Sequence, residues 1–250
     1  ISKNYMKIKI ISAVFPPEPI VSAYTSEMLV KSLVKKGHQV QVITAYPNRP
    51  QGEIHKGYKQ KLIESSFNSG ENFNITRVFS FISKSSTLIS RLLENLSFGF
   101  LSSIVLLFSK KPDVVYANTW PLFAQGFVSI VCKIRKIPLV LSIQDIYPET
   151  LISQNRFAED SVFSRLLRLL DQCIVNAVDA LVVISEGFSE ICQKSRNVTK
   201  EKISIIPNFQ EDIFENLNDE SSYRKELGIP DDALVFAYGG NIGTAAGLPH

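Results

Sequence analysis

Short runs of apolar, β-branched residues alternate along the chain with longer segments in which apolar residues recur every three or four positions. Residues 7–14 (KIKIISAV) are typical of a central strand in a parallel sheet, whereas residues 26–36 place apolar side chains on one helical face. The same patterns predict strands at 39–44, 75–81, 114–117, 139–143, 180–184 and 203–206, and helices at 122–133, 162–177 and 186–194. Seven strands separated by helices predict a Rossmann-like, doubly wound and mainly parallel α/β sheet. Only one of these strands, 75–81, falls in the polar stretch between residues 47 and 86.

A long apolar helix is predicted at residues 88–111. Its uncharged part, residues 95–109, has 15 residues, which is too short to cross a hydrocarbon core of about 30 Å. Two interpretations stay open: a core helix of the α/β fold, or a helix that lies on a membrane. In the second case the flanking cations would face anionic headgroups: Lys84, Arg91, Lys110 and Lys111. Both hold if one face of the helix is buried and the other meets lipid.

A second unit is predicted to begin near residue 227. An apolar strand is expected at 233–238, and it leads into the glycine-rich turn at 239–243. A buried strand followed by such a turn is how phosphate- and nucleotide-binding sites begin in α/β domains. The residues up to 250 are too few to close a hydrophobic core. We therefore expect a Rossmann-like domain at 1–226, with a linker at 216–222, and only the start of a second domain at 227–250.

Composition excludes several classes of protein. The net charge of +3, from 27 basic and 24 acidic residues, is too balanced to favour nucleic acid as a partner. The three cysteines have no zinc or CxxC spacing and predict reduced thiols, and no signal-peptide pattern precedes the first strand, so we expect a cytoplasmic protein. The three histidines form no metal-binding pattern, and no GxSxG or nucleophilic Cys–His arrangement is present. We expect no active-site metal and no hydrolase chemistry of those kinds.

Ligands of parallel α/β sheets bind at the carboxyl ends of the strands, which directs attention to the loops found there. The loop at 15–22 contains three prolines and lacks GxGxxG, so a dinucleotide is not expected. Within it, Glu18 is predicted either to hydrogen-bond a sugar hydroxyl or to cap the next helix. In the loop at 118–121, Asn118 is either a helix cap or a ligand contact. Trp120 there is suited to stacking on a sugar ring or on lipid.

The loop at 144–149 concentrates the most polarity. Gln144, Asp145, Tyr147 and Glu149 follow a mostly apolar strand, and polar groups gathered at a buried strand end favour a functional site. The alternative is that Asp145 caps a short helix and Tyr147 packs. Two further loops contribute less: Ser185 is predicted as an N-cap, and Pro207-Asn208 ends the last strand on the side of the second domain.

Seven short motifs then give the chain a family resemblance. They are FPPE (15–18), KGHQVQVIT (36–44), PDVV (112–115), DIYPE (145–149), VVISE (182–186), IIPN (205–208) and GGNIG (239–243). In this order the chain resembles glycosyltransferase family 4 enzymes of the GT-B fold. The most similar subgroup builds bacterial cell-surface polysaccharides and transfers N-acetylated amino sugars such as fucosamine.

The resemblance implies two Rossmann-like domains around a cleft and a retaining sugar transfer without a metal or other cofactor. The N-terminal domain would take a saccharide or lipid-linked acceptor at the inner face of the cytoplasmic membrane. The C-terminal domain, or a separate subunit, would hold most of the nucleotide-sugar donor. Asp145 or Gln144 occupies the place of a catalytic or positioning histidine in relatives, and Gly240, Asn241 and Gly243 would form the phosphate-facing turn. Since the family's main nucleotide-binding segment would follow residue 250, we expect this chain alone to be inactive.

Besides the phosphate-facing turn of Gly240, Asn241 and Gly243, the sequence assigns candidate residues in two groups. The catalytic candidates are Asp145, Glu18 and Glu149. The substrate-binding candidates are Pro17, Ser22, Asn118, Trp120, Gln144, Tyr147 and Asn208, with Pro17 to Ser22 approaching the donor diphosphate. Two alternatives remain: a GT-B sugar-nucleotide 2-epimerase, and a saccharide- or partner-binding module without catalytic activity.

Overall fold

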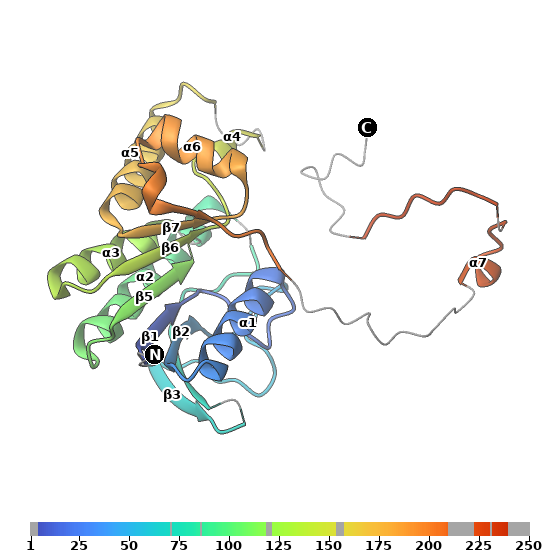
Figure 1. Ribbon diagram of the computed structural model, residues 1–250. Coiled ribbons are helices and arrows are strands. Elements are labelled where there is room, and N and C mark those ends of the chain that lie inside the picture. The colour runs from blue at the N-terminus through green and yellow to red at the C-terminus, as the bar shows by residue number, and fades with distance from the viewer. Residues whose placement is uncertain are drawn as a thin grey trace. The chain divides into compact units, whose positions relative to one another are not determined.

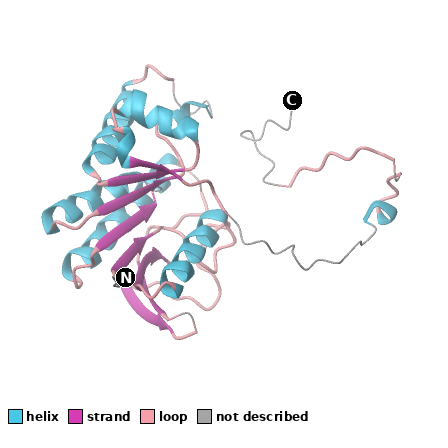
Figure 2. Ribbon diagram, in the orientation of Figure 1, coloured by secondary structure: helices cyan, strands magenta, loops and turns pink. Residues whose placement is uncertain are grey.

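The computed structural model describes residues 5–70, 72–85, 87–118, 122–153, 158–209, 223–230 and 232–239. The chain divides into two units, Ile1–Asn208 and Phe209–His250, and each is described by itself. The first unit is an α/β domain with a central sheet (Figure 1, Figure 2).

The sheet is mainly parallel, as the sequence predicts. Its strands, in the order in which they lie side by side, are β3 (Ile63–Asn68), β4 (Phe73–Val78), β2 (Gln39–Ala45), β1 (Lys7–Ile11), β5 (Val114–Asn118), β6 (Leu139–Ile143), β7 (Ala180–Val183) and β8 (Ile203–Ile205). Every neighbouring pair is parallel except β3 and β4, which are antiparallel. The order runs outward from β1 in both directions, which is the doubly wound arrangement.

The sheet has eight strands, one more than predicted. The additional strand is β3, and its surroundings explain why the sequence did not reveal it. It lies at one edge of the sheet, and most of its residues are exposed. A strand without a buried face needs no alternation of apolar and polar residues, so the sequence IESSFN carries no strand signal. Pairing with β4, from Ile63 opposite Val78 to Asn68 opposite Phe73, fixes it as a strand. The expectation of a single strand between residues 47 and 86 is therefore wrong.

Helices cover both faces of the sheet. In the first unit they are α1 (Val21–Lys35), α2 (Leu88–Phe108), α3 (Leu122–Arg135), α4 (Glu149–Ser153), α5 (Val162–Ala177) and α6 (Glu186–Arg196), with a 3₁₀ turn at Lys200–Lys202. Thr87, Ser161 and Ser185 cap α2, α5 and α6 by accepting a hydrogen bond from a backbone N–H three residues later. The predicted N-cap role of Ser185 is confirmed.

Two apolar cores hold these layers together. Helix α1 packs over β1 and β2 on one face, where Val30 meets Ile10 and Val42, all essentially without solvent exposure. Helices α2, α3, α5 and α6 cover the other face and bury residues such as Leu141 and Leu181. Burying one such side chain contributes about 1.5–3 kcal/mol, so these interfaces fix the sheet and the loops at its edges.

The second unit has little regular structure in its described part. A short helix, α7, spans Tyr223–Glu226, and residues 232–239 are not in strand conformation. The strand predicted at 233–238 is therefore wrong for this chain. An apolar strand is stable only when it is paired with neighbours and covered by a core. Here the side chains of Leu234 and Phe236 are 82% and 90% exposed. The linker predicted at 216–222 lies outside the described residues.

Candidate functional site

A cavity of about 220 Å³ opens at the carboxyl edge of the sheet, near the point where the strand order switches direction between β1 and β5. Such a switch point is where ligands bind in parallel α/β sheets, because the loops after the two central strands diverge there. The loops after β2 and β6 also reach the cavity. Its lining residues are Ser12, Val14, Ile20, Ser22, Arg49, Asn118, Gln144 and Asp145.

Asn118 ties three elements together at the floor of this cavity. It is the last residue of β5, and its Nδ2 donates to Ser12 Oγ (2.9 Å), just after β1, and to Ser26 Oγ (3.1 Å), on α1. Its carbonyl oxygen accepts a hydrogen bond from Gln125 of α3. A helix cap accepts from the first helical N–H groups, whereas this side chain donates and α3 begins only at Leu122. The helix-cap interpretation of Asn118 is therefore wrong, and its side chain fixes the cavity floor.

Asp145 is the carboxylate that lines the cavity. It follows β6, is half-buried, and has no hydrogen-bond donor or cation in contact with it among the described residues. Burial raises the pKa of this carboxyl above its usual value, since desolvation disfavours the charged form. Helix α4 begins at Glu149 and receives no cap from Asp145, so the capping alternative is wrong. A half-buried carboxylate that has no partner among the described residues is suited to bind a hydroxyl or a developing positive charge.

Glu18 lies beside the cavity and does not line it. The side chain is buried, and its Oε1 accepts hydrogen bonds from the backbone N–H groups of Asn48 (2.9 Å) and Arg49 (3.0 Å). Burial raises the pKa of this carboxyl, and these two hydrogen bonds act against the shift. The N-cap position of α1 is Ile20, so Glu18 does not cap that helix. Its carboxylate holds the loop after β2 in place.

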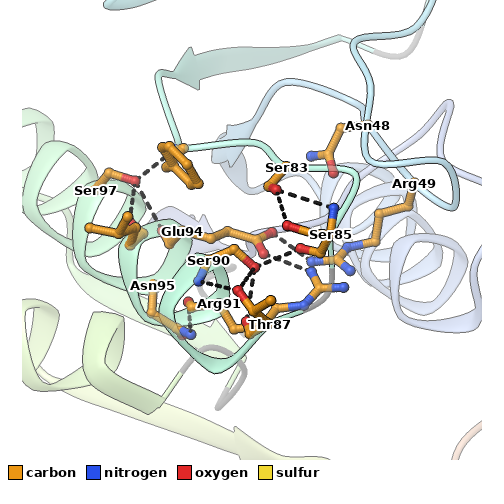
Figure 3. A network of polar contacts seen from close by, with 12 residues as sticks. Asn48, Arg49, Ser83, Ser85, Thr87, Ser90, Arg91, Glu94, Asn95 and Ser97 are labelled. Carbon is orange, nitrogen blue, oxygen red and sulfur yellow. Dashed lines mark hydrogen bonds and ion pairs between the residues drawn. The ribbon is translucent and has the colours of Figure 1, made fainter.

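The loop after β2 carries Arg49, the charged cavity residue that the sequence reasoning missed. Its Nη2 donates to Glu94 Oε1 (2.6 Å) on α2, and Arg91 donates to the other oxygen of Glu94 (2.8 Å). Figure 3 shows both arginines directed toward this one carboxylate. Two arginines thus share this one carboxylate beside the cavity. Ligands bind at the carboxyl ends of parallel strands, and β2 ends at Ala45, so the same rule could have selected this loop. The sequence analysis applied it only to the loops after other strands.

The first turn of α1 adds to the positive potential of the cavity. Ile20, its N-cap residue, makes no side-chain cap hydrogen bond, and Ile20 and Ser22 both line the cavity. The first backbone N–H groups of a helix lack intrahelical partners and carry the positive end of the helix dipole. Together with Arg49 they form an environment that favours an anion such as a phosphate. The cavity thus has a cationic wall and, at Asp145, an acidic one.

Glu149 and Tyr147 turn away from the cavity into a buried ion network. Arg196, whose side chain has no exposure, donates to Glu149 Oε2 (2.6 Å), to the Tyr147 carbonyl (2.7 Å) and to Asp171 Oδ2 (2.7 Å). Burial pulls the pKa of Glu149 up, but the hydrogen bond and charge of Arg196 prevail and leave it below its usual value. The Tyr147 side chain packs against the core, so the packing interpretation of Tyr147 is confirmed.

The cavity thus brings together four of the predicted site residues: Ser22, Asn118, Gln144 and Asp145. It leaves out Pro17, which is exposed, and Asn208, which is exposed at the end of the first unit. Trp120, Gly240, Asn241 and Gly243 lie outside the described residues. Within the described ranges, no three or more His, Cys, Asp or Glu side chains gather as a group that could hold a metal ion.

This domain, with its cavity at the switch point of the sheet, matches a known class. The chain belongs to glycosyltransferase family 4, whose family model matches residues 23–210. WcaI from Escherichia coli K12, whose name assigns it to colanic acid biosynthesis as a glycosyl transferase, is 27% identical over 97% of this chain and 60% of its own length. WbjE from Pseudomonas aeruginosa, also named as a glycosyltransferase, is 26% identical over 66% of this chain and 42% of its own length. The chain spans about half the length of the curated relatives it matches.

Solved glycosyltransferase structures resemble the fold at low sequence identity. Anabaena Alr3699/HepE in complex with UDP-glucose is 15% identical, with a TM-score of 0.48 over 90% of this chain and 50% of that one. Arabidopsis thaliana UGT89C1 complexed with UDP-L-rhamnose is 16% identical, with a TM-score of 0.49 over 92% of this chain and 55% of that one.

Proposed function

We propose that this chain is the acceptor-side half of a GT-B glycosyltransferase that retains anomeric configuration. The enzyme would transfer a sugar from a nucleotide-sugar to a saccharide or lipid-linked acceptor during assembly of a surface polysaccharide. The observation that carries the proposal is the cavity itself: Asp145, half-buried and without a hydrogen-bond or ion-pair partner among the described residues, shares it with Arg49 and the uncapped start of α1.

Each wall of the cavity has a role in this proposal. Arg49 and the first turn of α1 face the diphosphate of the donor and stabilise the negative charge that develops on the leaving group. Asp145 accepts a hydrogen bond from the acceptor hydroxyl and stabilises the positive charge of an oxocarbenium-like transition state. Asn118, Gln144 and Ser22 supply polar atoms that orient the acceptor. No step in this scheme uses a metal ion.

The relatives support the substrate class and the assignment of acceptor and donor binding to different domains. One is named for the biosynthesis of colanic acid, and two solved structures hold UDP-sugars. Because this chain spans only 60% of the length of WcaI, most donor contacts are expected in the part it does not include. We therefore expect the 250-residue chain alone to bind nucleotide-sugars weakly and to transfer no sugar.

A transfer assay tests the proposal. Radiolabelled UDP-, GDP- and dTDP-sugars are offered with a lipid-linked saccharide to a two-domain enzyme that contains residues 1–250, and to the chain alone. We expect the two-domain form to transfer the label to the acceptor. The chain alone should transfer no label, and calorimetry should detect little or no binding of donors to it. Micromolar donor binding by the chain alone would contradict the half-enzyme proposal. Interconversion of free nucleotide-sugars without acceptor would favour the epimerase alternative.

A further inference from the structure

Helix α2 belongs to the folded domain and ends before the chain reaches β5. Its 21 residues are apolar and long enough to cross a membrane, contrary to the length argument drawn from its uncharged part. However, 39% of its most apolar window is buried, and Phe98 and Leu106 pack into the core. The core interpretation of residues 88–111 is therefore confirmed, whereas contact of the outer face with lipid stays a prediction. The helix ends at Phe108, and the polar segment 109–112 leads from it toward β5.

The face of the sheet that α2 covers becomes polar toward the amino ends of the strands. Ile11, near the end of β1, belongs to the core on this face. Successive residues of a strand alternate between the two faces, so the residues two and four positions before Ile11 share its face. The neighbouring strands place polar residues beside them in register. Together these polar residues are Lys7 and Lys9 on β1, Gln39 and Gln41 on β2, and Asn74 on β4.

These side chains line a cavity of about 250 Å³, which Lys110, Lys111 and Pro112 complete from the segment after α2. Among the described residues that line it, four are lysines and none carries a carboxylate. Asp113 follows directly in the chain, but its carboxylate accepts a hydrogen bond from the backbone N–H of Lys7 (2.6 Å). The cavity therefore gathers positive charge from β1 and from the end of α2.

Lys9 is the unusual member of this group, because its side chain is buried. The residue is 5% exposed, and its Nζ donates to the hydroxyl of Ser109. No carboxylate of the described residues forms an ion pair with it. Burial, followed by the charge of Arg135, lowers the pKa of Lys9 to about 8, so the ammonium is still mostly charged at pH 7. A buried charge without an opposite charge is costly, and such groups are concentrated at functional sites.

The lining residues favour one class of ligand. Lysine ammonium groups bind phosphate as point charges, and four of them around one cavity favour an anion that carries several negative charges. The side-chain amides of Gln39 and Asn74 are hydrogen-bond donors suited to phosphate oxygens. An anion in this cavity would also supply the opposite charge that Lys9 lacks among the described residues.

We propose that this cavity binds a small, soluble phosphate anion with several charges, such as a diphosphate, with Lys9 at its floor and Lys110 and Lys111 at its rim. The site lies where the strands begin, whereas the cavity with Asp145 lies where they end. The two sites are therefore separate, and the proposal does not depend on the sugar-transfer reaction.

Calorimetry with the 250-residue chain tests the proposal, with pyrophosphate and inorganic phosphate as probes. We expect pyrophosphate to bind at low salt, more tightly than phosphate because it carries more charge, and to bind less tightly as salt rises. Absence of pyrophosphate binding at low salt would overturn the proposal. So would binding of anionic vesicles that depends on Lys9 while pyrophosphate does not bind, since the ligand would then be a lipid headgroup.

Lys9→Met separates a binding role from a structural one. The change keeps a long unbranched side chain and removes the charge, so pyrophosphate binding should weaken about tenfold or more, because a hydrogen bond to a charged group is lost. Thermal unfolding should occur at a higher temperature than in the unmodified chain, since the cost of burying the charge disappears. Unchanged pyrophosphate binding, with or without a loss of stability, would leave Lys9 a structural residue and overturn the proposal.

Variants of exposed residues define the position of the site. Lys110→Gln with Lys111→Gln should weaken pyrophosphate binding about fivefold, because both side chains are solvent-exposed. Lys56→Gln with Lys59→Gln is the matched control: both lysines are exposed in the loop between β2 and β3, at the opposite edge of the sheet, and binding should not change. An equal loss in the two double variants would mean that net charge, and not this cavity, attracts the anion.

Arg49→Gln distinguishes this cavity from the one at the carboxyl edge, which Arg49 lines. We expect the variant to keep the pyrophosphate binding that Lys9→Met removes, with thermal unfolding to show that both variants are folded. Pyrophosphate binding that is lost in Arg49→Gln and kept in Lys9→Met would assign the anion to the carboxyl edge and overturn the proposal.

Discussion

At the scale of single residues, Arg196 decides the position of the loop that carries Asp145. Its guanidinium is wholly buried and joins the Tyr147 carbonyl, Glu149 and Asp171. Burial raises the pKa of Asp171 to about 6, even with the arginine beside it. Because this folded-state pKa lies above the usual 3.8, ionisation of Asp171 lowers stability as pH rises from about 4 to about 6.

Replacing this arginine should therefore destabilise the domain in a pH-dependent way. Arg196→Met leaves two carboxylates without their buried cation, and we expect a loss of about 3–5 kcal/mol at pH 7. The loss should be smaller near pH 5, where Asp171 is mostly protonated. Urea unfolding at the two pH values measures both. Arg168→Met is the matched control: Arg168 is more exposed and 3.6 Å from Glu149, so it should cost about 1 kcal/mol or less. An equal loss in the two variants would contradict this role of Arg196.

Position along a strand was enough to predict where some side chains lie. Asp145, Gln144 and Asn118 lie at the sheet edge because each stands at the end of a predicted strand or directly after one. The direction of a side chain was not predictable, since it depends on partners far along the chain. Glu18 bonds to backbone 30 and 31 residues away, and Glu149 bonds to Arg196, 47 residues away. A pattern of neighbouring residues in the sequence cannot predict such long-range hydrogen bonds.

At the scale of elements, the close crossing of α2 and α3 depends on one glycine. A Cβ at Gly99 would lie 2.5 Å from Ala124 Cα and 2.9 Å from Ala124 Cβ, so the helices can approach this closely only without a side chain there. This contact sets how α2 presents its outer face and its Glu94 carboxylate. The sequence predicted both helices from their apolar spacing but gave no sign of which glycine lies at their contact.

We expect Gly99→Ala to destabilise the domain by about 1–3 kcal/mol, because overpacking forces the two helices apart. Gly126→Ala on α3 is the control, since its new Cβ would meet only Ile174 Cδ1 at 3.7 Å. That change should be neutral or stabilising by up to about 1 kcal/mol, because alanine favours helix. Thermal unfolding compares the two. A Gly99→Ala variant as stable as the unmodified chain would mean that α2 and α3 do not approach as described.

The same scale shows why β3 was missed while the central strands were found. Strands β1, β2 and β6 are mostly buried and rich in Ile, Val and Leu, whereas β3 is an exposed edge strand of mixed polarity. Burial on both faces generates the sequence signal. An edge strand is defined by hydrogen bonds to its neighbour, which any residue except proline can make.

At the scale of the whole molecule, the first unit is a folded domain with its own cores, and the chain matches its relatives over only part of their length. The fold class followed from the alternation of predicted strands and helices, which covers most of the first unit; the polar stretch between residues 47 and 86 is the exception. The strand predicted at 233–238 failed: a strand is stable only when it is paired, and residues 232–239 are not in strand conformation. The proposed chemistry of this chain lies in the cavity of the first unit, where Asp145 is the lining carboxylate.

The most direct test is the turnover of a two-domain enzyme that contains residues 1–250 with Asp145→Asn. The change keeps the size of the side chain and removes its charge, so stability should change little. If Asp145 acts on the acceptor hydroxyl, kcat should fall about 10²-fold or more. The unmodified enzyme should also lose activity as pH falls through the raised pKa of Asp145, and the variant should lack that acidic limb. Turnover and a pH profile like those of the unmodified enzyme would remove Asp145 from the mechanism and contradict the account.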